Sequence, residues 1–308
     1  MTNATLESAA RRVQDLASHC HDAVVPVPEI RFDDLSAIRI SGERHPLSET
    51  ARAAVASRLG IPIAYLKKCP PDVQAFNLNH WLEKEPNDKL FLRFDGLTVR
   101  AMFTTRYIPV DNAEVVDRVA GLGYAPETPV RLRLDERFMH VTIPDEVRTF
   151  AVRPEDRVTP GVSVGNSEVG LSSLTVAAFF LRLVCTNGMV TRTEVGSSYR
   201  HLSRKILEEF PTALSRVGEA LEVKRGQFRV SLDSAVRDPE STMKSLGQRF
   251  LLTPGEQEAA TWGFEQEPGA TMFHVANGYT KGAQYPGLPV DSSYRLERVG
   301  GDVLALAR

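Results

Sequence analysis

The chain has 308 residues, of which 42% are hydrophobic and 25% charged, a composition typical of globular proteins that excludes wholesale disorder. Its formal net charge of −2 argues against a protein that coats duplex DNA by bulk charge, although it is compatible with a local basic groove. Three widely spaced cysteines suit a reducing compartment, and no uncharged apolar stretch reaches the roughly 20 residues that span a bilayer, so we expect a cytoplasmic protein with no membrane partner.

Residues 1–87 are predicted to be mainly helical. Ser48 can cap a helix that runs through Arg58, because a glycine lies just past its end and a proline soon after. A second helix fits residues 71–85. Residues 51–65 also have the pattern of a helix-turn-helix, but a short turn motif is weak support for a DNA-binding regulator. We therefore favour a pair of packed helices.

Residues 88–202 are predicted to form an antiparallel β core. Asp95-Gly96 lies between two alternating runs, which is a strong signal for a β-hairpin. If these two residues form the loop, the apolar side chains of both strands share one face of the sheet. Arg93 and Arg100 then lie on the opposite face, away from the core.

The following strands complete the predicted sheet. Arg131 and Arg133 alternate with apolar residues, as the arginines of the first hairpin do. Residues 173–185 are mostly apolar at both odd and even positions, so both faces of the strand are apolar, which is typical of a central strand. Asn187-Gly188 then predicts a two-residue turn with both residues at positive φ.

Residues 203–308 are predicted to be mainly helical. Thr253 to Glu256 form a capping box with proline at the first helical position. The order of helices, strands and helices predicts an α+β protein, in which an antiparallel β-sheet core built from hairpins is flanked by N-terminal and C-terminal helices. We expect the three regions to form one compact unit.

Few motifs point to catalysis. Residues 161–165, Gly-Val-Ser-Val-Gly, match the nucleophile elbow of hydrolases, but that elbow needs a helix directly after the serine. Here a polar loop and another apolar strand follow. The seven histidines have no metal-binding spacing, and no phosphate-binding or dinucleotide-binding glycine motif occurs. We therefore expect no metal and no cofactor.

Charge is unevenly distributed along the chain. Residues 182–205 carry five basic side chains and one acidic, whereas residues 232–270 carry three basic and seven acidic ones. The basic run suits a single nucleic-acid strand, whose phosphates are held by charge and whose bases stack on rings. The alternative is a solvated edge satisfied by carboxylates of the acidic segment. The predicted nucleic-acid-binding residues are Arg93, Arg100, Arg131, Arg133, Arg192, Tyr199, Arg200, Arg204 and Lys205.

Four segments are similar to recurrent segments of one known family: Ala56–Tyr65, Asn77–Trp81, Asn166–Arg192 and Asn277–Thr280, the last with Gly278 where alanine is expected. That family comprises phage/plasmid-like proteins of unknown function, encoded by prophages and plasmids. The resemblance implies a mobile-element origin and carries over no catalytic residue. The predicted architecture also resembles, by topology alone, the annealing fold of single-strand annealing recombinases, in which a hairpin, sheet and helix form a basic groove on an oligomeric ring.

These features predict a mobile-element-associated protein that binds single-stranded DNA and promotes strand annealing in recombination, which requires no chemical step of its own. We expect a homo-oligomer. One alternative is an oligomeric structural or interaction protein. The other is a hydrolase-type enzyme acting on nucleic acid or nucleotide, so whether the protein is an enzyme stays open. Polar side chains in a loop between apolar strands suit such a site: Asn166, Ser167, Glu168, His140 and His201.

Overall fold

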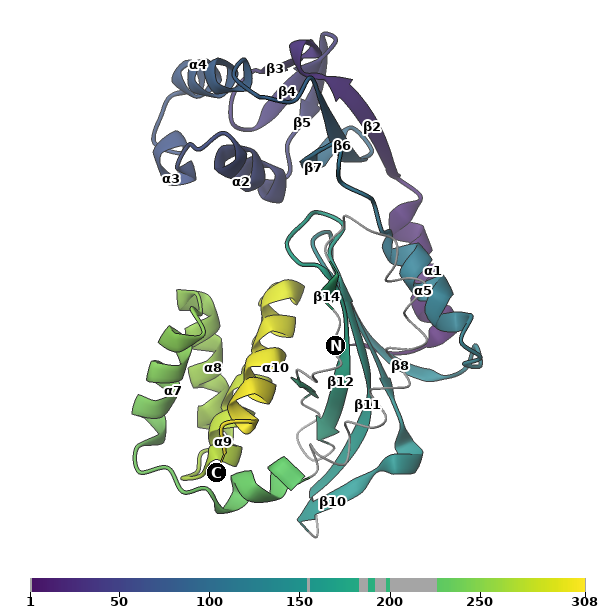
Figure 1. The fold of residues 1–308 in the computed structure, drawn as a ribbon, viewed down its shortest axis with the longest axis vertical. Helices are drawn as coiled ribbons and strands as arrows, with labels where there is room; N and C mark the ends of the chain where they lie inside the picture. The colour runs from purple at the N-terminus through teal and green to yellow at the C-terminus, as the bar shows by residue number, and fades with distance from the viewer. Residues whose placement is uncertain (1, 154–155, 183–187, 192–197, 200–225, 308) are drawn as a thin grey trace.

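The computed structural model describes residues 2–153, 156–182, 188–191, 198–199 and 226–307. Two bodies can be distinguished in Figure 1, a smaller module that runs from β2 (Cys20–Pro26) to β7 (Thr98–Thr104) and a larger body below it. The chain leaves the larger body after α1 (Leu6–Ala17) and returns to it at α5 (Asn112–Ala120). The smaller module is therefore an insertion between two helices of the larger body.

The larger body is built on an eight-stranded sheet. Its strand order is β1-β8-β9-β11-β12-β13, with β10 paired to β11 and β14 paired to β12, and every pairing is antiparallel. β12 is buried at all nine of its residues, as expected of a strand that is apolar on both faces, but it lies second from the end of the strand order and not at its centre. The strands are β1 (Thr2–Thr5), β8 (Pro129–Leu134), β9 (Met139–Pro144), β10 (Phe150–Arg153), β11 (Asp156–Asn166), β12 (Leu174–Arg182), β13 (Gly188–Thr191) and β14 (Ser198–Tyr199).

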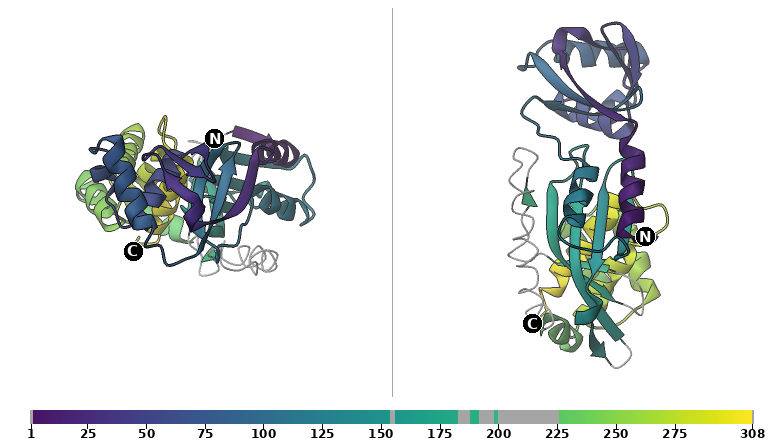
Figure 2. Two further views of the ribbon diagram at one scale, coloured as in Figure 1. Left: turned by 90° about the horizontal axis from the view of Figure 1, so that it is seen from above. Right: turned by 90° about the vertical axis from the view of Figure 1, so that its right-hand side faces the viewer.

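Helices cover the two faces of this sheet. α1 and α5 lie on one face, and α7 (Pro239–Arg249), α8 (Pro254–Gln266), α9 (Met272–Gly282) and α10 (Val290–Leu304) lie on the other (Figures 1 and 2). Under α1 and α5 the core contains apolar side chains of β8, β9 and β11, such as Leu132, Val141 and Val164. Under α10, Tyr294 packs against Phe138 and Phe179. α1, α5 and α10 thus bury an apolar stripe on the sheet, whereas α7 and α8 pack on neighbouring helices; such burial is the usual source of helix stability in proteins.

The smaller module has two three-stranded sheets, β2-β6-β7 and β3-β4-β5. One core joins them to three helices, with Phe32, Leu66, Leu78 and Leu92 among its buried residues. Its remaining elements are η1 (Val27–Glu29), β3 (Ile30–Phe32), β4 (Ala37–Ile40), β5 (Glu43–Pro46), α2 (Glu49–Arg58), α3 (Ile63–Leu66), α4 (Pro71–Leu82) and β6 (Lys89–Asp95). A short 3-10 helix, η2 (Glu146–Arg148), belongs to the larger body.

The α+β class with antiparallel sheets is confirmed, as are the two helix starts with clear capping signals. The Ser48 side chain accepts a hydrogen bond from the first turn of α2, which ends at Arg58, and Thr253 and Glu256 form the capping box of α8. The N-terminal region also contains five strands, β1 to β5, that the sequence analysis does not predict. Among the described residues, no helix combines the length and the apolar character needed to cross a membrane.

The hairpin of β6 and β7 exists, but its loop lies one residue later than predicted. Asp95 pairs with Thr98, so Gly96, at φ +53°, and Leu97 form the loop. A register irregularity follows at Arg100, because Phe94 pairs with Val99 while Arg93 pairs with Ala101. Such a bulge reverses the side-chain parity of one strand relative to the other. Met102 therefore packs in the core, on the face where the unbroken alternation places the arginines.

The predicted turn at residues 187–188 is also misplaced. Gly188 pairs with Leu181 in the ladder between β12 and β13, and Met189 pairs with Phe180. A two-residue turn at Asn187-Gly188 would instead pair Met189 with residue 186. Gly188 is therefore a strand residue, and Asn187 lies outside the described residues.

Candidate functional site

One face of the sheet carries a row of polar side chains beneath α10. Arg133 on β8 pairs in register with His140 on β9. His140 in turn pairs with Gly165 on β11, two residues beyond Ser163. Because alternate residues of a strand point to the same face, the arginines of β8, His140 and Ser163 all lie on the α10 side of the sheet.

His140 links this row to α10. Its Nε2 lies 2.8 Å from Ser163 Oγ, and its Nδ1 lies 3.4 Å from one carboxylate oxygen of Glu297 on α10. The other carboxylate oxygen lies 2.9 Å from the Arg133 guanidinium. Since a carboxylate only accepts hydrogen bonds, we assign the imidazole proton to Nδ1, which leaves Nε2 to accept from the Ser163 hydroxyl.

Burial dominates the electrostatics of this group. The side chains of His140 and Glu297 are both 0% exposed. Burial lowers the pKa of His140 well below its usual value, and the charges of Arg133 and Arg131 lower it further, so the ring is neutral at pH 7. Burial raises the pKa of Glu297, and the two arginines oppose that rise. We assign Glu297 as ionised, because a protonated carboxyl would leave the buried Arg133 charge without compensation.

Ser163, His140 and Glu297 have the connectivity of a hydrolase triad but lack the access that catalysis requires. Ser163 is fully buried in the middle of β11, which continues as a strand to Asn166, so no nucleophile elbow forms. The two motif glycines are explained by close packing: a Cβ at Gly161 would lie 2.2 Å from the carbonyl oxygen of Ile143, and one at Gly165 would lie 2.9 Å from the Phe138 ring. The three polar residues hold α10 against the sheet.

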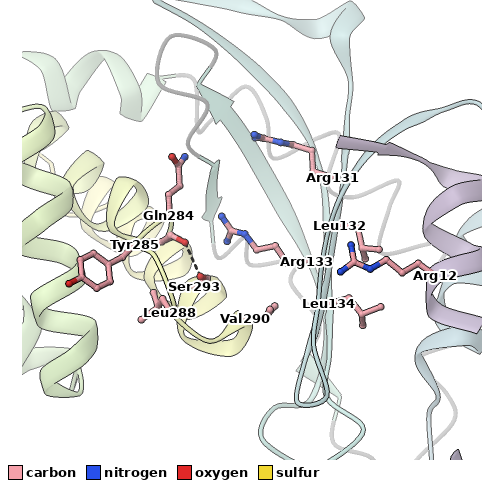
Figure 3. Close-up of a pocket in the computed structure, with 11 residues that line it drawn as sticks. Arg12, Arg131, Leu132, Arg133, Leu134, Gln284, Tyr285, Leu288, Val290 and Ser293 are labelled. Atoms are coloured by element: carbon pink, nitrogen blue, oxygen red, sulfur yellow. Dashed lines mark hydrogen bonds between the residues drawn. The ribbon is translucent and has the colours of Figure 1, made fainter. Parts of the chain in front are cut away.

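A pocket opens beside this buried group, at the β8 side of the sheet. Its volume is about 380 Å³, and three arginines but no carboxylate are among its lining residues. In Figure 3 Arg131 and Arg133 extend from β8 toward the loop between α9 and α10, whereas Arg12 approaches from α1 on the other side of the strand. The full lining is Arg12, Arg131, Leu132, Arg133, Leu134, Ala283, Gln284, Tyr285, Leu288, Val290 and Ser293.

The lining of the pocket carries positive charge. Glu297, behind the lining, compensates Arg133 directly at 2.9 Å, and two further guanidinium groups, those of Arg131 and Arg12, line the same pocket. Burial lowers the pKa of Arg131, Arg133 lowers it by like-charge repulsion, and Glu297 opposes both effects. A bound anion would relieve this repulsion and would receive planar, charge-assisted hydrogen bonds from the guanidinium groups.

Sequence reasoning found two of the pocket arginines and missed the other polar residues. Arg12, Gln284, Tyr285 and Ser293 come from segments far apart in the chain, and no local pattern connects them. Glu297 had a signal, because it shares the stripe of α10 that carries the buried residues Tyr294, Gly301 and Leu304. A carboxylate on a buried stripe requires a partner in the core.

Arg93 and Arg100 lie elsewhere, at the junction of the two bodies. The sequence analysis expects them on an exposed face, away from the core, but both side chains are buried. Arg93 bonds to Asp22, at 2.9 Å, and to Asp111, and Arg100 bonds to Glu168. Bound to these carboxylates, the two guanidinium groups join the smaller module to the larger body.

The polar loop at residues 166–168 serves the same junction. Glu168 also accepts a hydrogen bond of 2.6 Å from the backbone N–H of Asn112, at the start of α5. The Asn166 amide donates to the carbonyl of Val110 at 3.0 Å, and the Ser167 hydroxyl donates to the carbonyl of Arg137 at 2.8 Å.

The described residues of the alternative enzyme site are not brought together in one cluster. By strand alternation Asn166 lies on the face opposite His140 and Ser163, where it bonds to the segment before α5. His201 lies outside the described residues. Among the described residues, no group of three or more His, Cys, Asp or Glu side chains is placed to hold a metal ion.

Most of the predicted basic run lies outside the described residues. Arg192, Arg200, Arg204 and Lys205 lie outside the described residues, and only the backbone of Tyr199 is described, in β14 opposite Leu174. Arg182, at the start of the basic run, forms an ion pair of 2.5 Å with Glu267 of the acidic segment. For this residue the alternative holds, in which carboxylates of the acidic segment satisfy the basic run.

Comparison with known protein families identifies the family of this chain. A family model described as "Domain of unknown function (DUF932)" matches residues 100–277, which is more than half of the chain, and the chain belongs to that family. The matched range begins within β7 and ends in α9, so it covers most of the larger body and little of the smaller module. No curated protein and no solved structure matches the chain.

Proposed function

We propose that this member of the DUF932 family binds single-stranded nucleic acid and that the arginine pocket beside β8 holds a backbone phosphate. The observation that carries the proposal is the charge of the pocket, whose lining contains Arg12, Arg131 and Arg133 and no carboxylate. Arginine is the side chain best suited to phosphate, because its planar fork donates two parallel hydrogen bonds.

The size of the pocket and the charge of the chain favour a single strand over a duplex. A volume of about 380 Å³ lies at the lower end of small-molecule pockets and suits one nucleotide unit. A single strand can direct one phosphate into such a pocket, whereas a duplex presents a regular convex backbone. The net charge of −2 adds no general attraction for a duplex, so binding depends on local contacts.

The wider biological role is part of the same proposal. The resemblance to phage/plasmid-like proteins supports an origin on mobile elements, and strand annealing needs only that phosphate charge is neutralised while base pairing supplies the free energy. The basic residues Arg192, Arg200, Arg204 and Lys205, with Tyr199, would extend the contacts along the strand. In this role the protein works in the cytoplasm as a homo-oligomer and uses no cofactor.

Binding of a labelled single strand across a salt series tests the proposal. Each phosphate contact that is lost should reduce the slope of log affinity against log salt by about 0.7. Arg131→Ala and Arg12→Ala should therefore weaken binding and reduce the slope, with the melting temperature of the exposed Arg12 variant unchanged. Arg237→Ala is the matched control, since it removes the same charge from an exposed position outside the pocket.

Two results would refute the proposal. One is that the parent protein does not bind a single strand at low salt. The other is that the Arg131 and Arg12 variants bind with the same affinity and salt dependence as the Arg237 control. A parent that binds duplex as tightly as a single strand would contradict the strand preference.

A further inference from the structure

The outer surface of α4 exposes aromatic rings that do not pack in any core. Phe76 is 71% exposed and Trp81 is 45% exposed. Both belong to α4, at the margin of the smaller module in Figure 1. Clustered exposed apolar side chains on a folded protein mark a binding surface more often than isolated ones do.

The orientation of α4 is fixed, so these rings cannot turn inward. Leu78 and Leu82 on its other side are buried at 0% and 4% exposure. The Asn79 side chain forms two hydrogen bonds with the backbone of Phe32, at 2.8 and 2.9 Å. Gln74 donates to the carbonyl oxygens of Leu66, the last residue of α3, and of Cys69, at 3.0 and 2.9 Å. The exposure of Phe76 and Trp81 is therefore built into the fold.

The Lys84 ammonium lies close to the exposed rings. Phe76 and His80 lie one turn apart on α4, and Lys84 follows just beyond the end of the helix. The rings of Phe76 and His80 are nearly parallel, at 12° with centroids 6.0 Å apart. The Lys84 ammonium lies 4.6 Å from the centre of the Trp81 ring and 2.9 Å from His80 Nε2.

We propose that this α4 aromatic face, defined as Phe76, His80, Trp81 and Lys84, stacks the bases of single-stranded nucleic acid while Lys84 contacts a phosphate. The inference rests on the proposed function and adds a second contact surface to it, in the smaller module. Flat rings next to a positive charge are the combination that binds single strands without sequence preference, because every base has a π-face and a phosphate follows each base.

A protein partner is the competing occupant, and the chemistry of this face favours nucleic acid. The ammonium contacts both His80 and Trp81, so any partner that covers the rings must also supply an anion at that point. Each nucleotide of a single strand supplies both a ring and an anion. An apolar groove on a protein would instead have to bury the ammonium without compensation, which is unfavourable.

Tryptophan fluorescence can test the inference directly. The chain has two tryptophans, and Trp262 lies in α8 of the larger body, so Trp262→Phe leaves Trp81 as the only indole. Titration with fluorescein-labelled oligothymidylate gives two readouts, anisotropy for total binding and Trp81 emission for contact at this face. We expect Trp81 emission to fall in parallel with the rise in anisotropy.

Two kinds of variant at Phe76 identify the type of contact. Loss of stacking on one ring should weaken binding by about fivefold or more, so Phe76→Ala and Phe76→Leu should both show this loss and Phe76→Tyr should not. Val147→Ala, at a 96% exposed apolar position in the larger body, is the control and should bind like the parent. Retained binding in Phe76→Leu would indicate apolar docking and overturn the inference.

The remaining outcomes separate this inference from the proposed function. If anisotropy rises while Trp81 emission stays constant and Phe76→Ala binds normally, the α4 aromatic face is not used and the proposed function stands. If Trp81 emission changes with protein concentration without nucleic acid, the face joins copies of the chain and the inference fails. If the anisotropy of the labelled strand does not rise with the parent protein or with any variant, the proposed function fails and the inference fails with it.

Discussion

The pair formed by Glu297 and Arg133 should make a large contribution to the stability of the larger body. The Glu297 side chain is 0% exposed and that of Arg133 is 7% exposed, with a contact of 2.9 Å between them. Glu297→Gln preserves the size and shape of the side chain and removes only the charge. Breaking a buried ion pair from one side costs about 3–5 kcal/mol, because the remaining charge stays buried without compensation.

The arrangement around Glu297 places this variant toward the upper part of that range. Arg131 and His140 lie on the same face, and Glu297 opposes the like-charge repulsion between Arg131 and Arg133. The double variant Glu297→Gln with Arg133→Met should recover much of the loss, since replacing a whole buried pair with apolar groups is often neutral. The coupling between the two sites should therefore be large and favourable in a double-mutant cycle.

Urea denaturation, with all variants made in a Trp81→Phe background so that Trp262 is the only indole, gives the required free energies from far-UV circular dichroism and from Trp262 emission. Trp262 is suitable because it lies in α8, which packs on α9 beside α10. A loss below about 1 kcal/mol in the single variant would show that Glu297 is protonated in the folded protein and does not compensate the buried charge of Arg133. A double variant whose loss equals the sum of the two single losses would show that the pair is not coupled.

Three further predictions concern other parts of the fold. The pKa of His140 in the folded protein lies below its unfolded value near 6.5, so the folded protein binds fewer protons than the unfolded chain. The stability present above pH 6.5 should therefore fall by up to about 1.4 kcal/mol for each pH unit below 6.5. His140→Gln should reduce this dependence of stability on pH, measured by urea denaturation at pH 7.5 and 5.5, and an unchanged dependence would contradict the assignment. Glu168→Gln should destabilise the junction by about 3 kcal/mol, because it leaves the buried Arg100 without its carboxylate, and limited proteolysis should then cut between the two bodies faster than in the parent. Gly161→Ala should lower the melting temperature or prevent folding, since its Cβ would lie 2.2 Å from the carbonyl oxygen of Ile143; an unchanged melting temperature would mean that β9 and β11 separate at little cost.

The sequence alone determined the features that depend on neighbouring residues. The starts of α2 and α8 are set by Ser48 and Thr253, whose side chains bond to the first turn of their own helix. The burial of β12 follows from an apolar run that has no polar face to expose to water. These signals act over a few residues, so the α+β class could be predicted without knowledge of the rest of the chain.

Register was harder to predict, because one inserted residue changes every position after it. In the hairpin of β6 and β7 the loop lies one residue later than the Asp95-Gly96 pattern indicates, and the bulge at Arg100 then changes the parity of Met102. Alternation identifies which residues belong to a strand, but the bulge that shifts the pairing leaves no clear mark in the sequence.

Only the tertiary structure decided which arginines join the two bodies and which line a pocket. Arg93 and Arg131 both sit in alternating strands and have the same local pattern. Arg93 is bound to Asp22 and Asp111, whereas Arg131 lines a pocket with Arg12 and Tyr285. A charged side chain becomes structural when distant carboxylates meet it in the core, and it can face a ligand when other segments enclose a pocket around it. That outcome is set where segments far apart in the chain come together in space, and no local pattern of residues records it.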